Sequence, residues 1–203
     1  GVETTTPLAA PGARSASAVP AAVHRDAGPA EQEEATSVHS EFAGVLYLVN
    51  LALYLELYAD FTRPLRPGLA IPLGDFLALV GERAVGAGIR DDPIERVLAE
   101  LAGRRANDPP ARGFVPPGGA GLRSWLDELA ATLESRAAPA LGVPAGGALA
   151  FLCARPGEVT LTALRLRAHF ALAEHPIEIR AAGLDRDPGW VPAAGRAISF
   201  HYE

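Results

Sequence analysis

Alternating apolar and polar side chains dominate the C-terminal quarter of the chain. A period of two is typical of a half-buried antiparallel strand, because successive side chains leave opposite faces of the pleat. The alternation changes phase at residues 163–164, which predicts a bulge or bend there. We expect a four-stranded antiparallel sheet. Its predicted strands cover residues 148–154, 159–172, 177–184 and 196–202.

Helical periodicity replaces this alternation in the preceding part of the chain, where apolar residues recur every three or four positions. The predicted helices cover residues 38–60, 75–85, 92–102 and 122–137. Helices followed by strands predict an α+β fold, with about four helices packed with the sheet. A proline- and glycine-rich segment over residues 104–121 is expected to be a surface loop and a candidate hinge.

Composition divides the chain into three parts. Residues 1–36 are rich in Ala, Pro, Ser and Thr and lack a hydrophobic period, so they are expected to be a disordered tail or linker. Residues 37–138 form the helical region and residues 147–203 the β region. We expect the last two parts to pack as one compact domain.

The most apolar segment, residues 38–60, leaves three alternatives open. Its uninterrupted apolar stretch from Phe42 to Val49 is too short to span a bilayer, and the polar residues Asn50, Glu56 and Asp60 interrupt the remainder of the segment. A buried helix is favoured, starting near Ser40. An interfacial helix would instead dock on a membrane through residues 42–58, and a true membrane span is the least favoured alternative.

Charge and composition exclude several functions. The net charge is -6 with a pI near 5.4, which argues against nucleic acid as a partner. All 18 basic residues are arginine, so pyridoxal-phosphate and P-loop chemistry lack their lysine. No signal peptide is visible, which predicts a cytoplasmic location. The absence of methionine suggests a segment of a longer protein.

The polar face of the predicted sheet is the first candidate site. Arginine and histidine side by side could bind a carboxylate or phosphate, could contact another protein, or could simply be solvated. The candidate contact residues are Arg165, Arg167, His169, Arg180 and His201.

The loop that precedes the last strand is the second candidate. Asp185 and Asp187 resemble the start of a calcium loop, but the later glutamate ligand is missing. Trp190 is expected to cover one end of the core. The histidines show no metal-ligand spacing, and Cys153 is expected in the core, so we predict no metal, no cofactor and no catalytic residue.

Two stretches, SEFAGVLYLVNLALYLELYADFTRPL and IEIRAAGLDRDPGWVPAAGRAISFHYE, carry a resemblance to other proteins. They resemble a poorly characterised bacterial family that forms the C-terminal region of larger proteins from GC-rich organisms. The family is associated with phage-tail-like contractile injection systems. This resemblance implies an assembly or accessory protein and transfers no functional residue.

The sequence therefore favours a non-enzymatic structural or protein-interaction module of a larger bacterial assembly, with self-association as a further possibility. The first alternative is a small-anion-binding or enzymatic domain. Its pocket would lie between sheet and helices, lined by His169, His201, Arg180 and Asp185. The second alternative is peripheral membrane docking.

Overall fold

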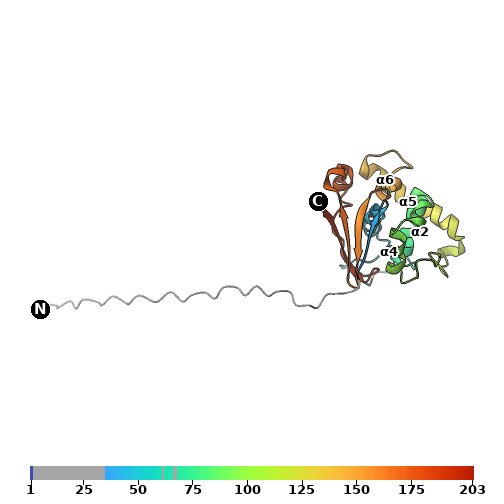
Figure 1. Cartoon of the computed structure of the whole chain (residues 1–203), viewed down its shortest axis with the longest axis horizontal. Helices are drawn as coiled ribbons and strands as arrows, with labels where there is room; N and C mark the ends of the chain where they lie inside the picture. The colour runs from blue at the N-terminus through green and yellow to red at the C-terminus, as the bar shows by residue number, and fades with distance from the viewer. Residues whose placement is uncertain (2–34, 61, 66–67) are drawn as a thin grey trace. The chain divides into compact units, whose positions relative to one another are not determined.

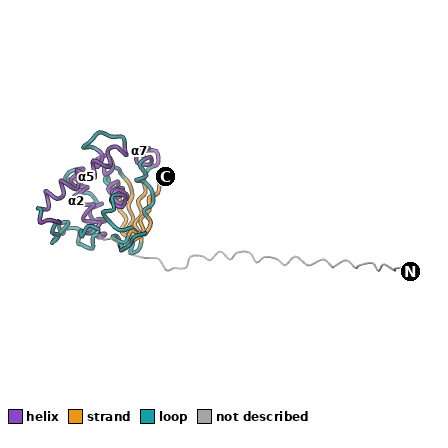
Figure 2. The backbone as a smooth tube through the Cα atoms, turned by 180° about the vertical axis from the view of Figure 1, so that it is seen from behind, coloured by secondary structure: helices purple, strands orange, loops and turns teal. Residues whose placement is uncertain are grey.

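The protein is an α+β domain in which helices cover one face of a five-stranded mixed sheet (Figures 1 and 2). The computed structural model describes residues 1, 35–60, 62–65 and 68–203. Most of the predicted tail, residues 2–34, lies outside these described residues.

The strands are β1 (Thr36–Ser40), β2 (Gly157–Leu161), β3 (Arg165–Phe170), β4 (Gly189–Val191) and β5 (Arg196–Tyr202). The α-helices are α1 (Leu48–Tyr54), α2 (Leu73–Val85), α3 (Gly88–Asp91), α4 (Ile94–Leu101), α5 (Leu122–Leu141), α6 (Ala148–Cys153) and α7 (Ile177–Ala181). The 3₁₀ helices are η1 (Ala43–Tyr47), η2 (Pro117–Gly119) and η3 (Leu172–Glu174).

The sheet differs from the predicted one in strand number and direction. Its order is β1-β2-β3-β5-β4, and β3 pairs with β5 in parallel while the other pairs are antiparallel. The parallel pair requires a crossover, which η3 and α7 provide. The prediction of four antiparallel strands is therefore wrong in detail, although the α+β class is correct.

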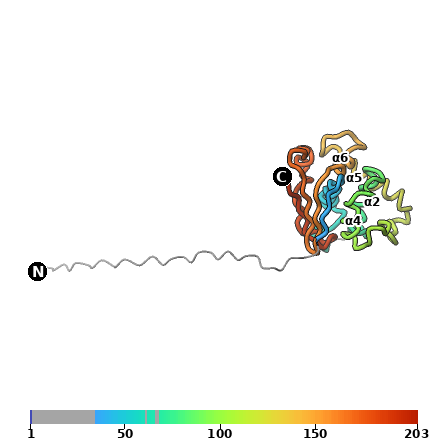
Figure 3. The backbone as a smooth tube through the Cα atoms, viewed as in Figure 1, coloured from blue at the N-terminus to red at the C-terminus, as the bar shows by residue number. Residues whose placement is uncertain are grey.

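The first strand comes from a part of the chain that was expected to begin a helix. β1 pairs with β2, more than a hundred residues later in the sequence, and the two lie side by side in Figure 3. After Ser40, whose hydroxyl accepts a 2.9 Å hydrogen bond from the Phe42 N–H, the chain continues into η1 and α1. Residues 43–49 are buried, so the predicted buried helix exists but is shorter.

Helix α6, residues 148–153, lies where a strand over residues 148–154 was predicted. A short apolar run does not distinguish a buried helix from a buried strand. The N–H groups of Ala148 and Leu149 donate to the carboxylate of Glu134 at 2.6 and 3.0 Å. A carboxylate at the start of a helix satisfies free amide groups and complements the helix dipole. This contact from α5 favours the helix.

Residues 177–184 form helix α7 and a turn, where a strand was also predicted. Ile179 is buried whereas Ile177 is 68% exposed, so the two isoleucines do not share a buried face. Glu178 lies in the first turn and Arg180 in the last, as the helix dipole favours. Three apolar residues at alternate positions were too few to separate the two periods.

The predicted second strand is a hairpin of two strands. The chain reverses at residues 162–164, where the Thr162 hydroxyl accepts a 3.1 Å hydrogen bond from the Arg165 N–H. The phase change that predicted a bulge therefore marks a complete reversal. Both strands direct their apolar residues to the helical side.

The helical layer is built around α2, and Asp75 in its first turn fixes the proline-rich loop. The Asp75 carboxylate accepts hydrogen bonds from Arg104 Nε at 2.6 Å and from the Ala111 N–H at 2.9 Å. Arg104 also binds Glu95 of α4. These buried contacts attach residues 104–111 to the helices, which argues against a free hinge at that end of the loop.

Gly74 allows α2 and α4 to approach closely, because a Cβ there would overlap the Leu98 carbonyl oxygen. We predict that Gly74→Ala lowers the free energy of unfolding by about 1–3 kcal/mol through overpacking. Gly121→Ala is the matched control, since its φ is -67° and no atom lies within 4 Å of the added carbon. Urea denaturation measures both; equal effects would contradict the close packing.

Candidate functional site

The outward side of the sheet, called here the open face, carries the polar side chains of alternate strand positions. Helices α2, α4 and α5 lie on the opposite side (Figures 1 and 2). The strand register arranges the open face in three cross-strand rows. The rows are His39–Glu158–His169–His201, Ser37–Thr160–Arg167–Ser199, and Arg165–Ala197–Trp190.

The histidine row crosses four adjacent strands. The rings of His169 and His201 stack with centroids 4.7 Å apart and planes 18° apart. His201 Nε2 lies 3.1 Å from the Ser199 hydroxyl, and His169 Nδ1 lies 3.8 Å from a carboxylate oxygen of Glu203. These contacts hold the two rings in a defined orientation on the surface.

Two arginines and a tryptophan occupy the other rows. Arg165 and Arg167 are exposed on β3, so both guanidinium groups are available to a partner. Trp190 is 47% exposed on β4, beside Ala197 in the register. The prediction that Trp190 covers one end of the core is therefore wrong, because it lies on the open face at the sheet edge.

Arg180 does not lie on the open face, where it was predicted. It belongs to α7, and its Nε donates to Asp185 Oδ2 at 2.9 Å. Of the five predicted contact residues, the structure brings four together on the open face and places Arg180 apart from them. The reason is that residues 177–181 form a helix and not a strand.

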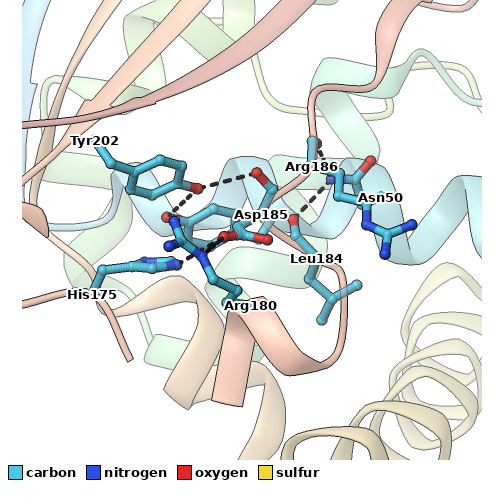
Figure 4. A network of polar contacts seen from close by, with 8 residues as sticks. Asn50, His175, Arg180, Leu184, Asp185, Arg186 and Tyr202 are labelled. Atoms are coloured by element: carbon cyan, nitrogen blue, oxygen red, sulfur yellow. Dashed lines mark hydrogen bonds and ion pairs between the residues drawn. The ribbon is translucent and has the colours of Figure 1, made fainter. Parts of the chain in front are cut away.

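Asp185 is the centre of a polar network that joins the crossover to the core (Figure 4). The same Asp185 oxygen lies 3.2 Å from His175 Nε2, and the side chains of His175 and Asp185 are only 4% and 8% exposed. The Tyr202 hydroxyl lies 3.3 Å from the Asp185 carbonyl oxygen and 3.4 Å from the Tyr47 hydroxyl. Neither His175 nor Tyr47 was a candidate from the sequence.

Burial changes the acidity of this network. It raises the pKa of Tyr47, and it raises the pKa of Tyr202 to about 12, so both hydroxyls stay protonated. Burial also lowers the pKa of His175, although the hydrogen bond to Asp185 acts in the opposite direction. His175 is therefore neutral near pH 7 in the folded protein.

The rest of the predicted loop site is also structural. Asp187 accepts a 2.7 Å hydrogen bond from the Phe200 N–H, which ties the loop to β5. Asn50 of α1 donates to the carbonyl oxygens of Leu184 and Arg186 at 2.8 and 2.7 Å (Figure 4). Within the described residues, no group of three or more His, Cys, Asp or Glu could hold a metal ion.

The predicted pocket between sheet and helices is not lined as expected, since His169 and His201 lie on the open face. A groove of about 810 Å³ instead runs between α1, α5 and residues 182–188.

Cys153 lies in the core, and burial raises its pKa to about 12, so its thiol is a poor nucleophile. None of the helices in the described part of the chain combines the length and hydrophobicity needed to cross a membrane.

His175 makes the stability of the fold dependent on pH. Below about pH 6.5 the unfolded chain binds a proton on His175 that the folded protein does not bind, so stability falls as the pH falls. We predict that the free energy of unfolding decreases from pH 7.5 to pH 5.5, and that His175→Gln reduces this decrease.

One such proton changes stability by at most about 1.4 kcal/mol per pH unit. Urea titrations across this pH range measure the effect, with the exposed His39→Gln as control for the loss of one imidazole. The same pH dependence in wild type and His175→Gln would rule out this source.

Comparison of the chain with family models, curated proteins and solved structures gave no match. The open face and the Asp185 network therefore have to be interpreted from their own chemistry.

Proposed function

We propose that the protein is a non-enzymatic interaction module of a larger bacterial assembly, and that its open face binds an acidic surface of a partner protein. The observation that carries this proposal is the one-sided sheet. Its covered face packs on the helices, whereas its other face presents Arg165, Arg167 and the histidine row. A rigid sheet fixes the spacing of these groups before a partner arrives, which lowers the entropic cost of binding.

Charge complementarity supports an acidic partner. The chain as a whole has a net charge of -6. The open face differs from this average, since Arg165 and Arg167 project from one strand and three histidines lie in the adjacent row. Glu158 is the acidic member of that row. Arginine forms forked hydrogen bonds with carboxylates and is enriched at protein interfaces.

The row that contains Trp190 supplies an apolar anchor for the same interface. The Trp190 side chain lies beside Ala197, which separates it from Arg165 in the register. Tryptophan and arginine are the residues most often found at the energetic centre of protein interfaces. An acidic partner surface with an apolar recess would match this combination.

The resemblance of two stretches to a bacterial family associated with phage-tail-like injection systems supports an assembly as the setting. One of these stretches, residues 177–203, supplies α7, β4 and β5. It therefore includes the crossover and the strands that carry Trp190 and His201. A second copy of the chain is the competing partner, since its own surface is acidic overall.

We predict that replacing Arg165 and Arg167 together with serine weakens partner binding at least tenfold, because both charged contacts are lost. The full-length protein would be purified with its partner from the native host, and the complex measured by native mass spectrometry and by a binding titration. The matched control replaces Arg112 and Arg123, two exposed arginines outside the sheet.

Binding that is lost in the sheet variant and kept in the control variant would support the open face as the interface. Equal affinity of both variants for the partner would overturn the proposal. A wild-type homodimer that the sheet variant converts to monomers would also overturn it, because the acidic surface would then belong to a second copy.

A further inference from the structure

A small cavity of about 40 Å³ lies beside the Asp185 network, where η1, the end of β3 and the segment before α7 meet. Its wall includes Tyr47, Phe170, His175 and Arg155. Glu174 is an exposed carboxylate that also lines it. The cavity is independent of the open face, because the inward side chain of Phe170 contributes to its wall.

The two ring nitrogens of His175 have different surroundings, because Nε2 contacts Asp185 and Nδ1 has no hydrogen-bond partner among the described residues. Nε2 faces the Asp185 carboxylate, which only accepts hydrogen bonds, so Nε2 carries the proton in the neutral ring. No group among the described residues bonds to Nδ1. Since no fully buried side-chain nitrogen or oxygen lacks a partner in the described part of the chain, Nδ1 reaches open space. His175 is one of the residues that line the cavity.

Arg155 brings positive charge to the wall of the cavity. Its Nε donates to the Phe151 carbonyl oxygen at 2.9 Å, and its guanidinium carbon lies 4.4 Å from the centre of the Phe151 ring. These contacts orient the guanidinium group, and among the described residues no hydrogen bond engages its terminal N–H groups, which could therefore serve another acceptor. Its charge acts against the burial effect on the pKa of Tyr47, which stays raised, and adds to the lowering of the pKa of His175.

We propose that this cavity binds the carboxylate group of a small organic acid between Arg155 and His175, and that His175 takes up a proton from solvent when the acid binds. A carboxylate only accepts hydrogen bonds, so it requires an N–H at Nδ1 as well as the guanidinium group. The Asp185 carboxylate behind the ring stabilises the imidazolium that results.

The charges around His175 are compatible with this proton uptake. Asp185 favours the imidazolium, whereas Arg180 and Arg155 oppose it. The hydroxyls of Tyr47 and Tyr202 are neutral, and the exposed Glu174 carboxylate lies at the cavity. Burial is the main cause that keeps His175 neutral, and Arg180 and Arg155 add to it. A bound carboxylate would add a negative charge beside Arg155 and thereby favour the imidazolium.

The volume of the cavity limits the ligand. A water molecule needs roughly 10–15 Å³ of such volume, so about 40 Å³ has room for three non-hydrogen atoms. A carboxylate group has three. We therefore expect the carboxylate group of formate or acetate to enter the cavity, with the rest of a larger acid outside it. The carboxylate could belong to a free acid or to the end of a peptide chain.

We predict that sodium acetate shifts the ¹⁵N resonance of His175 Nδ1 from an unprotonated to a protonated position in the full chain, with saturation. Titrations at pH 7.5 and 6.5, at constant ionic strength with chloride, should show an affinity increase of up to tenfold per pH unit, as uptake of one proton requires. The same titration is repeated with two other compounds. N-acetylalanine represents the carboxylate end of a peptide chain, and acetamide is a neutral isostere of acetate.

Two variants test the placement of the ligand. Arg155→Met should weaken acetate binding at least tenfold, whereas Glu174→Gln should strengthen it by removing a like charge. Arg136→Met, an exposed arginine of α5, is the matched control. A thermal unfolding curve and a circular dichroism spectrum for each variant verify the fold, and the Glu174 variant gives a gain that misfolding would not imitate.

The proposal is overturned if acetate produces no saturable shift at about 100 mM, or if the three variants bind acetate equally. Equal binding of acetamide would likewise overturn it. The Arg165→Ser/Arg167→Ser variant should bind acetate like the wild type, so failure of this site and failure of the open face are separate outcomes.

Discussion

The parallel pairing of β3 with β5 determines where the other functional groups of the C-terminal half lie. Two parallel strands cannot be joined by a tight turn, so the chain must leave β3, pass through η3 and α7, and return along β4 before β5 begins. This excursion brings His175 and Asp185 together beside the core. The Asp185 carboxylate then binds both His175 and Arg180, and so attaches the helix of the crossover to the residues that precede it.

The same pairing places β5 in the interior of the sheet and extends the open face across it. His169 and His201 stack because their positions are directly opposite each other in the parallel register. The inward positions of these strands, among them Phe170, contact the aromatic rings of Tyr47 and Tyr202. One strand pair therefore supports both the open face, which we propose binds a protein, and the cavity, which we propose binds a carboxylate.

Sequence patterns predicted the elements in which one period extends over many residues. The helices α2, α4 and α5 and the strand β5 lie close to their predicted ranges. The patterns failed where a distant contact selects the local structure. Residues 148–153 form a helix whose first amides bind Glu134, and no local signal in a six-residue apolar run indicates that contact.

The candidate site shows the same division. Alternation along β3 was sufficient to group Arg165, Arg167 and His169, and the long register with β5 added His201. Arg180 was misplaced because the five residues of α7 are too few to establish a period. The role of His175 depends on Asp185, ten residues later, and on the depth of burial that the crossover creates. Neither the contact with Asp185 nor the burial of His175 can be read from the local spacing of residues.

The direction of the strands also determines how the domain would respond to mechanical force. β1, β3 and β5 run the same way, so the start of β1 and the end of β5 lie at opposite ends of the sheet. Tension applied between Thr36 and Tyr202 would act along the strands and load their hydrogen bonds in shear. Many bonds must then break together, whereas peeling would break them one at a time. Forced unfolding is governed by the unfolding barrier and not by equilibrium stability. Because shear requires many bonds to break together, we expect this barrier to be higher for tension along the strands than for peeling.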